Sequence, residues 1–168
     1  MVRILYNNRG LSLIELVVTM VILTILASVV LPSARMTTVR MKEIELKRNL
    51  REIRNAIDEY KRTYDRGVTE GKIQVVINKP QGYPESLEVL VEGHDFDGYL
   101  MYKKKFLRRI PRDPLYQAPE GAERAEDLWG LRSHEDEPDS TNWGGENVFD
   151  VHSMSEAKAI DGTYYKDW

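Results

Sequence analysis

Residues 11–31 read LSLIELVVTMVILTILASVVL, and this run decides the architecture of the chain. Its residues are apolar, small or hydroxyl-bearing, except for one carboxylate, Glu15. A helix of about 20 apolar residues is long enough to cross the hydrocarbon core of a bilayer. We therefore predict a helix at Leu11–Leu31 that lies in lipid or in the core of an assembly, followed by a well-solvated remainder.

Residues 1–10 are polar and carry Arg3 and Arg9, so a cytoplasmic N-terminus is permitted. A cleaved secretory signal peptide has an apolar core of about 7–15 residues followed by a small-residue cleavage site. The run at 11–31 is longer, and Ala27-Ser28-Val29 makes a poor cleavage site. A plain single-pass anchor fits the length but leaves Glu15 unexplained.

Glu15 is costly in an apolar span, and an intramembrane carboxylate indicates a function that needs a partner. Cleavage of the chain after Gly10 would supply one, because the new α-amino group of Leu11 is a cation. Glu15 of one subunit could then pair with that amine on a neighbour. The alternative is that Glu15 only reaches the headgroup level near the end of the helix.

The segment Gly10-Leu11-Ser12-Leu13-Ile14-Glu15-Leu16 resembles the class III signal of type IV prepilins and type II secretion pseudopilins. This resemblance implies that prepilin peptidase cuts between Gly10 and Leu11 and methylates the new amine of Leu11. It also implies that Glu15 supports subunit assembly. Leu11 stands where the family usually has phenylalanine.

The resemblance extends along nearly the whole chain. Pro32 lies where many pilins carry a helix-bending proline, and Phe106–Pro114 and Asp161–Trp168 are similar to segments of the major pseudopilins. Classical pilins usually carry a C-terminal disulfide, whereas this chain has no cysteine. The chain is therefore identified as resembling the major pseudopilins (type G) of type II secretion systems. The alternative is a type IV pilin or minor pilin for adhesion, motility or DNA uptake.

Residues 32–66 continue the helical pattern in amphipathic form. Apolar and aromatic residues recur at spacings of three and four, which places them on one helical face. They are Leu46, Leu50, Ile53, Ile57, Tyr60 and Tyr64. Gly67 is a candidate for the residue that ends the helix after Arg66. We expect this stripe to pack on the core of a globular head.

Residues 67–168 are predicted to form that head. We expect a short helix at Tyr83–Val91, a candidate strand at Lys72–Ile77, and two strands at residues 127–133 and 147–153 separated by a polar loop. The fold class is therefore α+β and pilin-like: a long N-terminal helix packed on a small antiparallel sheet.

The resemblance also implies a calcium-binding loop, which matches Ser153–Gly162 here. Calcium prefers carboxylate and carbonyl oxygens, which the side chains of Glu156 and Asp161 and the carbonyl of Met154 can supply. This chain departs from the family where Glu156 replaces a common aspartate and Lys158 adds a positive charge. The alternative is a loop held by hydrogen bonds alone, and no other cofactor is expected.

Other kinds of function find little support. A net charge of −3 gives no overall basic surface for nucleic acid. His94, His134 and His152 lack the spacing of zinc ligands, and no catalytic fingerprint is present. We therefore predict that the chain is not an enzyme. The rival of another class is a single-pass membrane enzyme or binding module, with an uncut N-terminus and tolerance of Glu15→Leu.

The resemblance implies a mechanical role. The precursor would be inserted in the bacterial inner membrane by a single span, with its head in the periplasm. After cleavage it would polymerise with its own copies and with other pseudopilins on an inner-membrane assembly platform. The resulting fibre would drive protein export.

Overall fold

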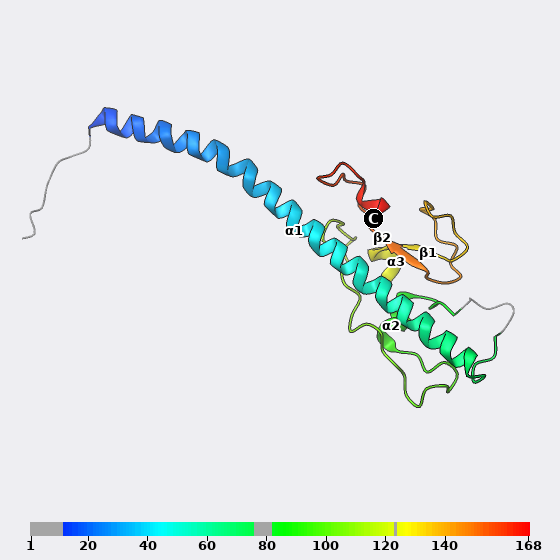
Figure 1. Cartoon of the computed structure of the whole chain (residues 1–168). Helices are drawn as coiled ribbons and strands as arrows, with labels where there is room; N and C mark the ends of the chain where they lie inside the picture. The colour runs from blue at the N-terminus through cyan, green and yellow to red at the C-terminus, as the bar shows by residue number, and fades with distance from the viewer. Residues whose placement is uncertain (1–11, 76–81, 123) are drawn as a thin grey trace, which may run out of the picture. The chain divides into compact units, whose positions relative to one another are not determined.

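The structure, a computed structural model, describes residues 12–75, 82–122 and 124–168, with the backbone alone for residues 29–35. Its elements, in chain order, are α1 (Leu13–Thr69), α2 (Leu87–Glu92), α3 (Ala125–Leu128), β1 (Gly130–Arg132), β2 (Asp150–His152) and a short 3₁₀ helix (Tyr165–Asp167) (Figure 1). The chain divides into two compact units, Met1–Val39 and Arg40–Trp168, and α1 contributes residues to both.

Within the second unit, α1 buries the predicted apolar stripe. Leu46, Leu50, Ile53, Ile57 and Tyr60 are all buried, and Tyr64 is partly buried against them. Burial follows the helical period because only one face of an amphipathic helix can turn toward a core. The predicted amphipathic helix is confirmed.

The predicted end of this helix at Arg66 was wrong, because α1 continues to Thr69. The residue that ends α1 is Gly71, whose φ is +69°. The Gly71 amide donates to the carbonyl of Val68 and the Lys72 amide to that of Gly67, each at 2.9 Å, as in a Schellman motif. Gly67 instead serves packing, because a Cβ there would lie 2.4 Å from Cδ1 of Ile73.

The two predicted strands pair as an antiparallel sheet of β1 and β2. Leu131 lies opposite Val151 in the register, and both side chains are buried in the core. The strands are shorter than predicted. Residues 127 and 128 belong to α3 instead, whose first amide, that of Ala125, donates to Oε1 of Glu88 at 2.8 Å.

The predicted helix at Tyr83–Val91 is present as α2 but begins later, at Leu87. Pro84 does not open it, because Ser86 is the N-cap residue and Pro84 lies before it. The Pro84 carbonyl instead accepts a hydrogen bond from the amide of Val148 at 2.8 Å. This bond ties the chain before α2 to the segment that leads into β2. The candidate strand at 72–77 is absent over residues 72–75, and its last two residues lie outside the described part.

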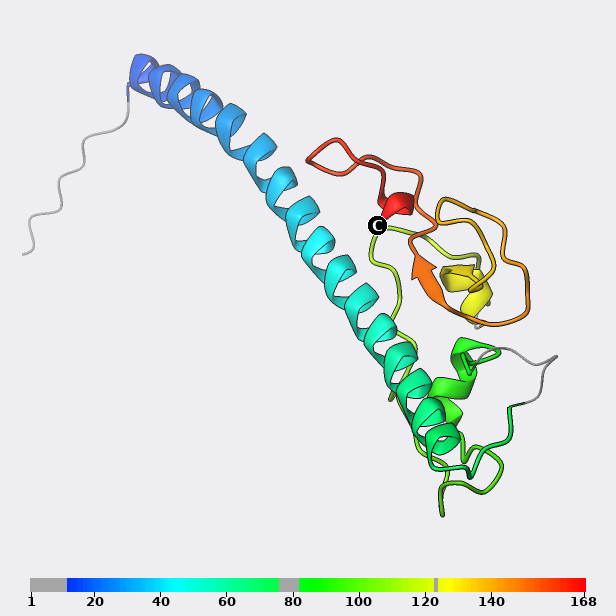
Figure 2. The ribbon, with the colours of Figure 1, turned by 45° about the vertical axis from the view of Figure 1, so that its right-hand side comes forward.

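The head packs along one side of the second half of α1, as the two views in Figures 1 and 2 show. Trp129 is fully buried in this core, and its indole Nε1 donates to the carbonyl of Pro111 at 2.8 Å. A single core thus joins residues of α1, α2, α3 and both strands. The predicted α+β, pilin-like class is confirmed.

Among the residues that the structure describes, no helix has the length and apolar character needed to cross a membrane.

Candidate functional site

The first turn of α1 holds Glu15, the predicted assembly residue. The Glu15 amide donates to Oγ of Ser12 at 3.3 Å, and the Leu16 amide donates to the Ser12 carbonyl at 3.1 Å. Ser12 therefore caps the helix, and the order Ser-x-x-Glu is that of a capping box. The carboxylate of Glu15 is exposed near amides that favour negative charge. Gly10 and Leu11, the predicted processing residues, lie outside the described residues.

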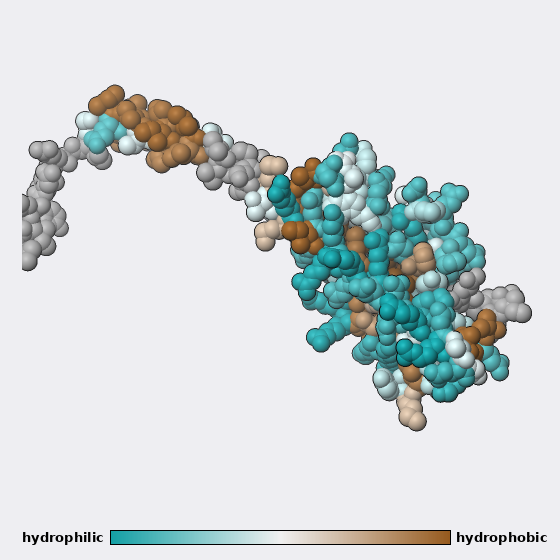
Figure 3. Space-filling model, viewed as in Figure 1, coloured by the Kyte–Doolittle hydropathy of each residue, from teal (hydrophilic) through white to brown (hydrophobic). Residues whose placement is uncertain are grey.

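The start of α1 exposes its apolar side chains, and Figure 3 shows one face of them in brown. Its large apolar residues between Leu13 and Leu26 have exposed fractions of 45–83 %. Globular proteins rarely expose so continuous an apolar surface unless it binds another surface or lipid. The described part of the first unit thus presents an apolar helix surface at Leu13–Leu26, called the apolar rod below, which is suited to contact with lipid or with another apolar surface.

The polar side chains on this rod do not interrupt its apolar character. The hydroxyls of Thr19, Thr24 and Ser28 donate to backbone carbonyls one turn earlier, at 2.7–2.8 Å. A hydroxyl that bonds its own helix needs no outside partner, which lowers the cost of moving it into apolar surroundings. Glu15 is the one ionisable side chain on α1 between residues 13 and 28.

In the second unit, Arg54 connects α1 to the sheet and to Trp168. Its guanidinium donates to Oδ1 of Asp150 at 2.7 Å and to Oδ2 at 3.3 Å, a two-pronged ion pair. The same side chain donates to the carbonyls of Val151 at 3.0 Å and Trp168 at 2.8 Å. Planar guanidinium groups suit such forked contacts better than lysine does. Arg54 therefore fixes β2 and the last residues of the chain on the helix.

The segment before the last loops, Phe106–Pro114, is fixed by a buried carboxylate. Asp113 accepts hydrogen bonds from the amide of Leu115 at 2.7 Å and the hydroxyl of Ser153. Ser153 follows β2 directly, so this contact connects the proline-containing segment to the start of the predicted calcium loop.

The predicted calcium ligands lie in a loop that is closed by its own hydrogen bonds. Oδ1 of Asp161 accepts from the amide of Thr163 at 3.0 Å and from its hydroxyl at 2.6 Å, and these bonds hold the Asp161 pKa below its usual value. Glu156 is exposed and Met154 is half-buried. Over the described ranges, no three His, Cys, Asp or Glu side chains come together in a way that could hold a metal ion.

The same loop is attached to α1 by Glu43. Oε1 of Glu43 accepts from the amide of Ile160 at 2.8 Å and from the hydroxyl of Tyr165 at 2.9 Å. Burial and this hydrogen bond raise the Tyr165 pKa to about 12. These hydrogen bonds are consistent with the alternative of a loop held by hydrogen bonds alone. Calcium binding stays a prediction.

Sequence reasoning missed three of these residues. Ser12 could have been found, because Ser-x-x-Glu before an apolar run is a helix-start signal. Arg54 and Glu43 lie on the charged faces of the predicted helix, where the sequence alone does not distinguish them from solvated residues. Their partners lie 96 and more positions further along the chain, and no local pattern indicates such pairs.

Comparison with known proteins agrees with the resemblance to the pseudopilins. Residues 5–31 match the family described as "Prokaryotic N-terminal methylation motif". The chain is 30 % identical over 151 residues to the type II secretion system core protein G of Pseudomonas aeruginosa, covering 86 % of this chain and 94 % of that protein. No solved structure matches the chain.

Two further relatives carry the same description. The core protein G of Klebsiella michiganensis is 31 % identical, over 64 % of this chain and 68 % of the relative. That of Pectobacterium carotovorum subsp. carotovorum is 30 % identical over 65 % of this chain, and the match spans only 63 % of the relative's length. With the near full-length match to the Pseudomonas protein, these findings show that the chain belongs to the type II secretion system core protein G family, the major pseudopilins.

Proposed function

We propose that this chain is a structural subunit of a type II secretion pseudopilus, polymerises into a fibre that drives protein export, and has no enzymatic activity. The observation that carries this proposal is the rod at Leu13–Leu26, an apolar helix surface with one carboxylate at its start. It lies within the stretch that matches the methylation-motif family. Such a surface suits burial among like helices rather than chemistry on a substrate.

The precursor is inserted in the inner membrane through the apolar run at 11–31, with its head in the periplasm. Prepilin peptidase removes residues 1–10 and methylates the amine of Leu11. What supports these steps is the order of glycine, glutamate and apolar run, together with the family match over residues 5–31.

Assembly moves the rod from lipid into the centre of a fibre. Equivalent rods cover one another there, so the apolar surface that leaves lipid is buried again. A head-to-tail contact between identical subunits does not close on itself and produces an open helical filament. The partners are further copies, other pseudopilins and the inner-membrane assembly platform.

Glu15 sets the register of this assembly by pairing with the methylated amine of Leu11 on a neighbouring subunit. A carboxylate among apolar helices is costly when unpaired, so a subunit that enters at the wrong height is disfavoured. The capping contact of Ser12 holds the first turn of the helix in place for this pairing.

The test replaces Glu15 in a type II secretion strain that lacks its own major pseudopilin. We expect Glu15→Leu to abolish both sheared fibres and secretion of exported protein, with normal amounts of processed subunit. The control is Glu45→Gln, an exposed glutamate further along α1, which should assemble and secrete normally. Normal secretion by Glu15→Leu would contradict the proposal and favour a plain membrane anchor.

Calcium binding by the loop Ser153–Gly162 is a further proposal, supported by the family resemblance and by the oxygens of Met154, Glu156 and Asp161. Thermal unfolding in calcium and in magnesium at equal concentration tests it. A rise in Tm in calcium alone, lost in Asp161→Asn and kept in Asp139→Asn, is the expected result. Equal Tm values in both salts would leave a loop held by hydrogen bonds.

A further inference from the structure

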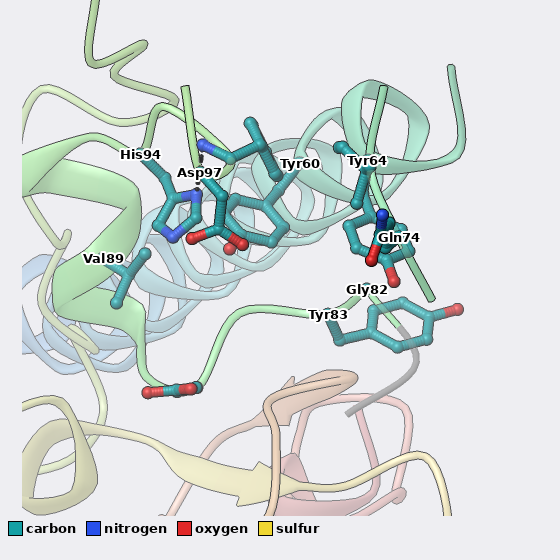
Figure 4. A pocket seen from close by; sticks show the side chains of 11 residues that line it. Tyr60, Tyr64, Gln74, Gly82, Tyr83, Val89, His94 and Asp97 are labelled. Carbon is teal, nitrogen blue, oxygen red and sulfur yellow. Dashed lines mark hydrogen bonds between the residues drawn. The ribbon is translucent and has the colours of Figure 1, made fainter. Parts of the chain in front are cut away.

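A pocket of about 170 Å³ lies within the second unit beside the last turns of α1 (Figure 4). Tyr60 and Tyr64 of α1 form one wall, Tyr83 and Glu85 come from the segment before α2, and the turn at 94–97 closes a third side. Neither the apolar rod nor the calcium loop contributes to it.

Aromatic rings form part of the wall, namely those of Tyr60, Tyr64, Tyr83 and Phe96, together with the imidazole of His94. The Tyr60 ring lies 4.8 Å from that of Phe96 and 5.6 Å from that of His94, measured between centroids. Tyr64 is part of this wall because residue 82 is glycine: a Cβ there would lie 2.2 Å from Cδ1 of Tyr64. The faces of such rings attract cations.

The charged groups of the pocket are mainly acidic. Glu85 and Asp97 both line it, and neither carboxylate has an ion-pair partner in the described part of the chain. Burial, and then the charges of Glu85 and Asp97, raise the Tyr60 pKa to about 12.

One cation already lies near the pocket, but its charge is matched. Nζ of Lys61 is 5.6 Å from the Tyr83 ring centroid and 6.0 Å from that of Tyr64. The same ammonium bonds to Oδ1 of Asp65, one turn further along α1. Among the described residues, Glu85 and Asp97 thus have no counter-charge.

The backbone at the pocket also holds an uncommon conformation. Phe96 and Asp97 have φ values of +55° and +57°, a region that residues other than glycine rarely adopt. The Phe96 amide donates to Nδ1 of His94 at 2.9 Å, which helps to hold this turn. Such strain gathers at binding sites, where it places side chains that relaxed backbone would not. Here it brings the Phe96 ring and the Asp97 carboxylate to the same pocket.

We propose that this pocket binds the cationic end of Arg48, Arg108 or Arg109, supplied by a neighbouring copy of this chain. Aromatic faces and two carboxylates around a small volume fit the end of a basic side chain. The same chain offers suitable groups, because Arg48, Arg108 and Arg109 are exposed without an ion pair in the described residues.

The source of the cation rests on the proposed function, because only a fibre brings many copies into fixed contact. The contact would join two different surfaces, as an open filament requires. The chemistry of the pocket does not depend on a fibre and can be tested on single subunits.

The first experiment titrates the full chain in detergent with n-butylammonium and, separately, with butan-1-ol, following the tyrosine ring signals by NMR. We expect saturable shifts with the cation and none with the alcohol of similar shape. Glu85→Gln and Asp97→Asn should each weaken binding about five-fold, which corresponds to about 1 kcal/mol. The control Glu92→Gln, an exposed acid outside the pocket, should bind as the unchanged chain does. Equal binding of both probes, or of neither, would overturn the proposal.

The second experiment identifies the source by oxidative cross-linking, for which the absence of native cysteines is convenient. Chains with Gln74→Cys, at a pocket position that leaves both carboxylates in place, are co-assembled with chains carrying Arg48→Cys, Arg108→Cys or Arg109→Cys. We expect a disulfide-linked dimer for at least one pairing in intact fibres. Fibres without any such dimer would overturn the neighbouring copy as source, whereas the absence of fibres would contradict the proposed function itself.

A third variant checks this chain's own Lys79, which lies outside the described residues. Lys79→Gln should bind n-butylammonium with unchanged affinity. Tighter binding would show that Lys79 competes for the pocket, and the cation would then come from the same chain.

Discussion

The two parts of α1 treat the same kind of side chain in opposite ways. Leu23 in the first unit is 64 % exposed, whereas Leu50 in the second is 2 % exposed. Both lie on one continuous helix, so helix formation does not distinguish them. The head covers Leu50, while no described part of the chain covers Leu23. The second part of α1 therefore stabilises the subunit, whereas the first part leaves its apolar surface exposed, as the proposed assembly requires.

The largest effect should come from a matched pair of truncations. Leu50→Ala leaves a cavity in the core and should lower the free energy of unfolding of the head by about 2–5 kcal/mol. Leu23→Ala removes the same atoms from an exposed site and should leave that free energy unchanged. Urea unfolding of the two variants, followed by Trp fluorescence, measures both.

In fibre assembly the two truncations should rank the other way, with the larger effect from Leu23→Ala. Leu23→Ala should reduce the yield of fibres from stable, processed subunits, because neighbouring rods lose contact area. A loss of head stability in Leu23→Ala equal to that in Leu50→Ala would remove the distinction between the two parts of α1.

The next effect concerns the contact that joins the head to the helix. Arg54→Met should destabilise the head by about 1–2 kcal/mol, because Asp150 and two carbonyls lose charged hydrogen bonds in a partly exposed site. Arg54→Lys keeps the charge but not the fork and should lie between the two. Amide hydrogen exchange at β2 and residues 163–168 should rise in the methionine variant. Unchanged exchange there would show that Arg54 does not hold the end of the chain.

A pH effect should come from His152, which is buried with its Nε2 unpaired among the described atoms. Burial is the main reason that its pKa lies below the ordinary 6.5, and nearby Arg132 and Arg54 lower it further. The unfolded chain therefore binds a proton more readily, and head stability should fall as pH drops through 6.5. The loss should be about 1 kcal/mol or less between pH 7.5 and 5.5.

Unfolding free energies across that range measure this dependence. His152→Gln should flatten the slope, while the exposed His134→Gln should keep it. The same slope in both variants would assign the effect to another group.

The smallest effect belongs to the surface pair of Glu59 and Lys104, whose charged atoms are 2.7 Å apart. The hydrogen bond from Lys104 is the main cause of the lowered Glu59 pKa. Glu59→Gln should cost about 0.5 kcal/mol, and the difference should shrink in 1 M salt. Glu52→Gln, an exposed acid on α1, serves as the control and should change nothing. A loss of unfolding free energy above 2 kcal/mol would contradict the small contribution expected of a surface ion pair.

Local periodicity made much of the fold predictable. The stripe from Leu46 to Tyr64 and the presence of the two strands follow from local periodic patterns that the sequence displays directly. Gly67 was misread because a glycine can end a helix or make room for a neighbour, and here Ile73 needs the room.

The candidate sites likewise fall into those made of contiguous residues, which the sequence shows, and those made of distant residues, which it does not. The motif around Glu15 is contiguous and could be read, as could the cap by Ser12. The pocket is assembled from α1, the segment before α2 and the turn at 94–97, so its members share no spacing. Arg54 and Asp150 lie 96 positions apart, and only the folded chain brings them together.

The first part of α1 is proposed to become an assembly element once cleavage after Gly10 frees the amine of Leu11. The most direct test co-expresses the precursor with a prepilin peptidase and measures the mass of the N-terminal peptide, with Asn8→Ala as a control that keeps Gly10. We predict a product that begins at methylated Leu11 and disappears in Gly10→Val. An uncut chain, or one cut after the apolar run, would contradict the account.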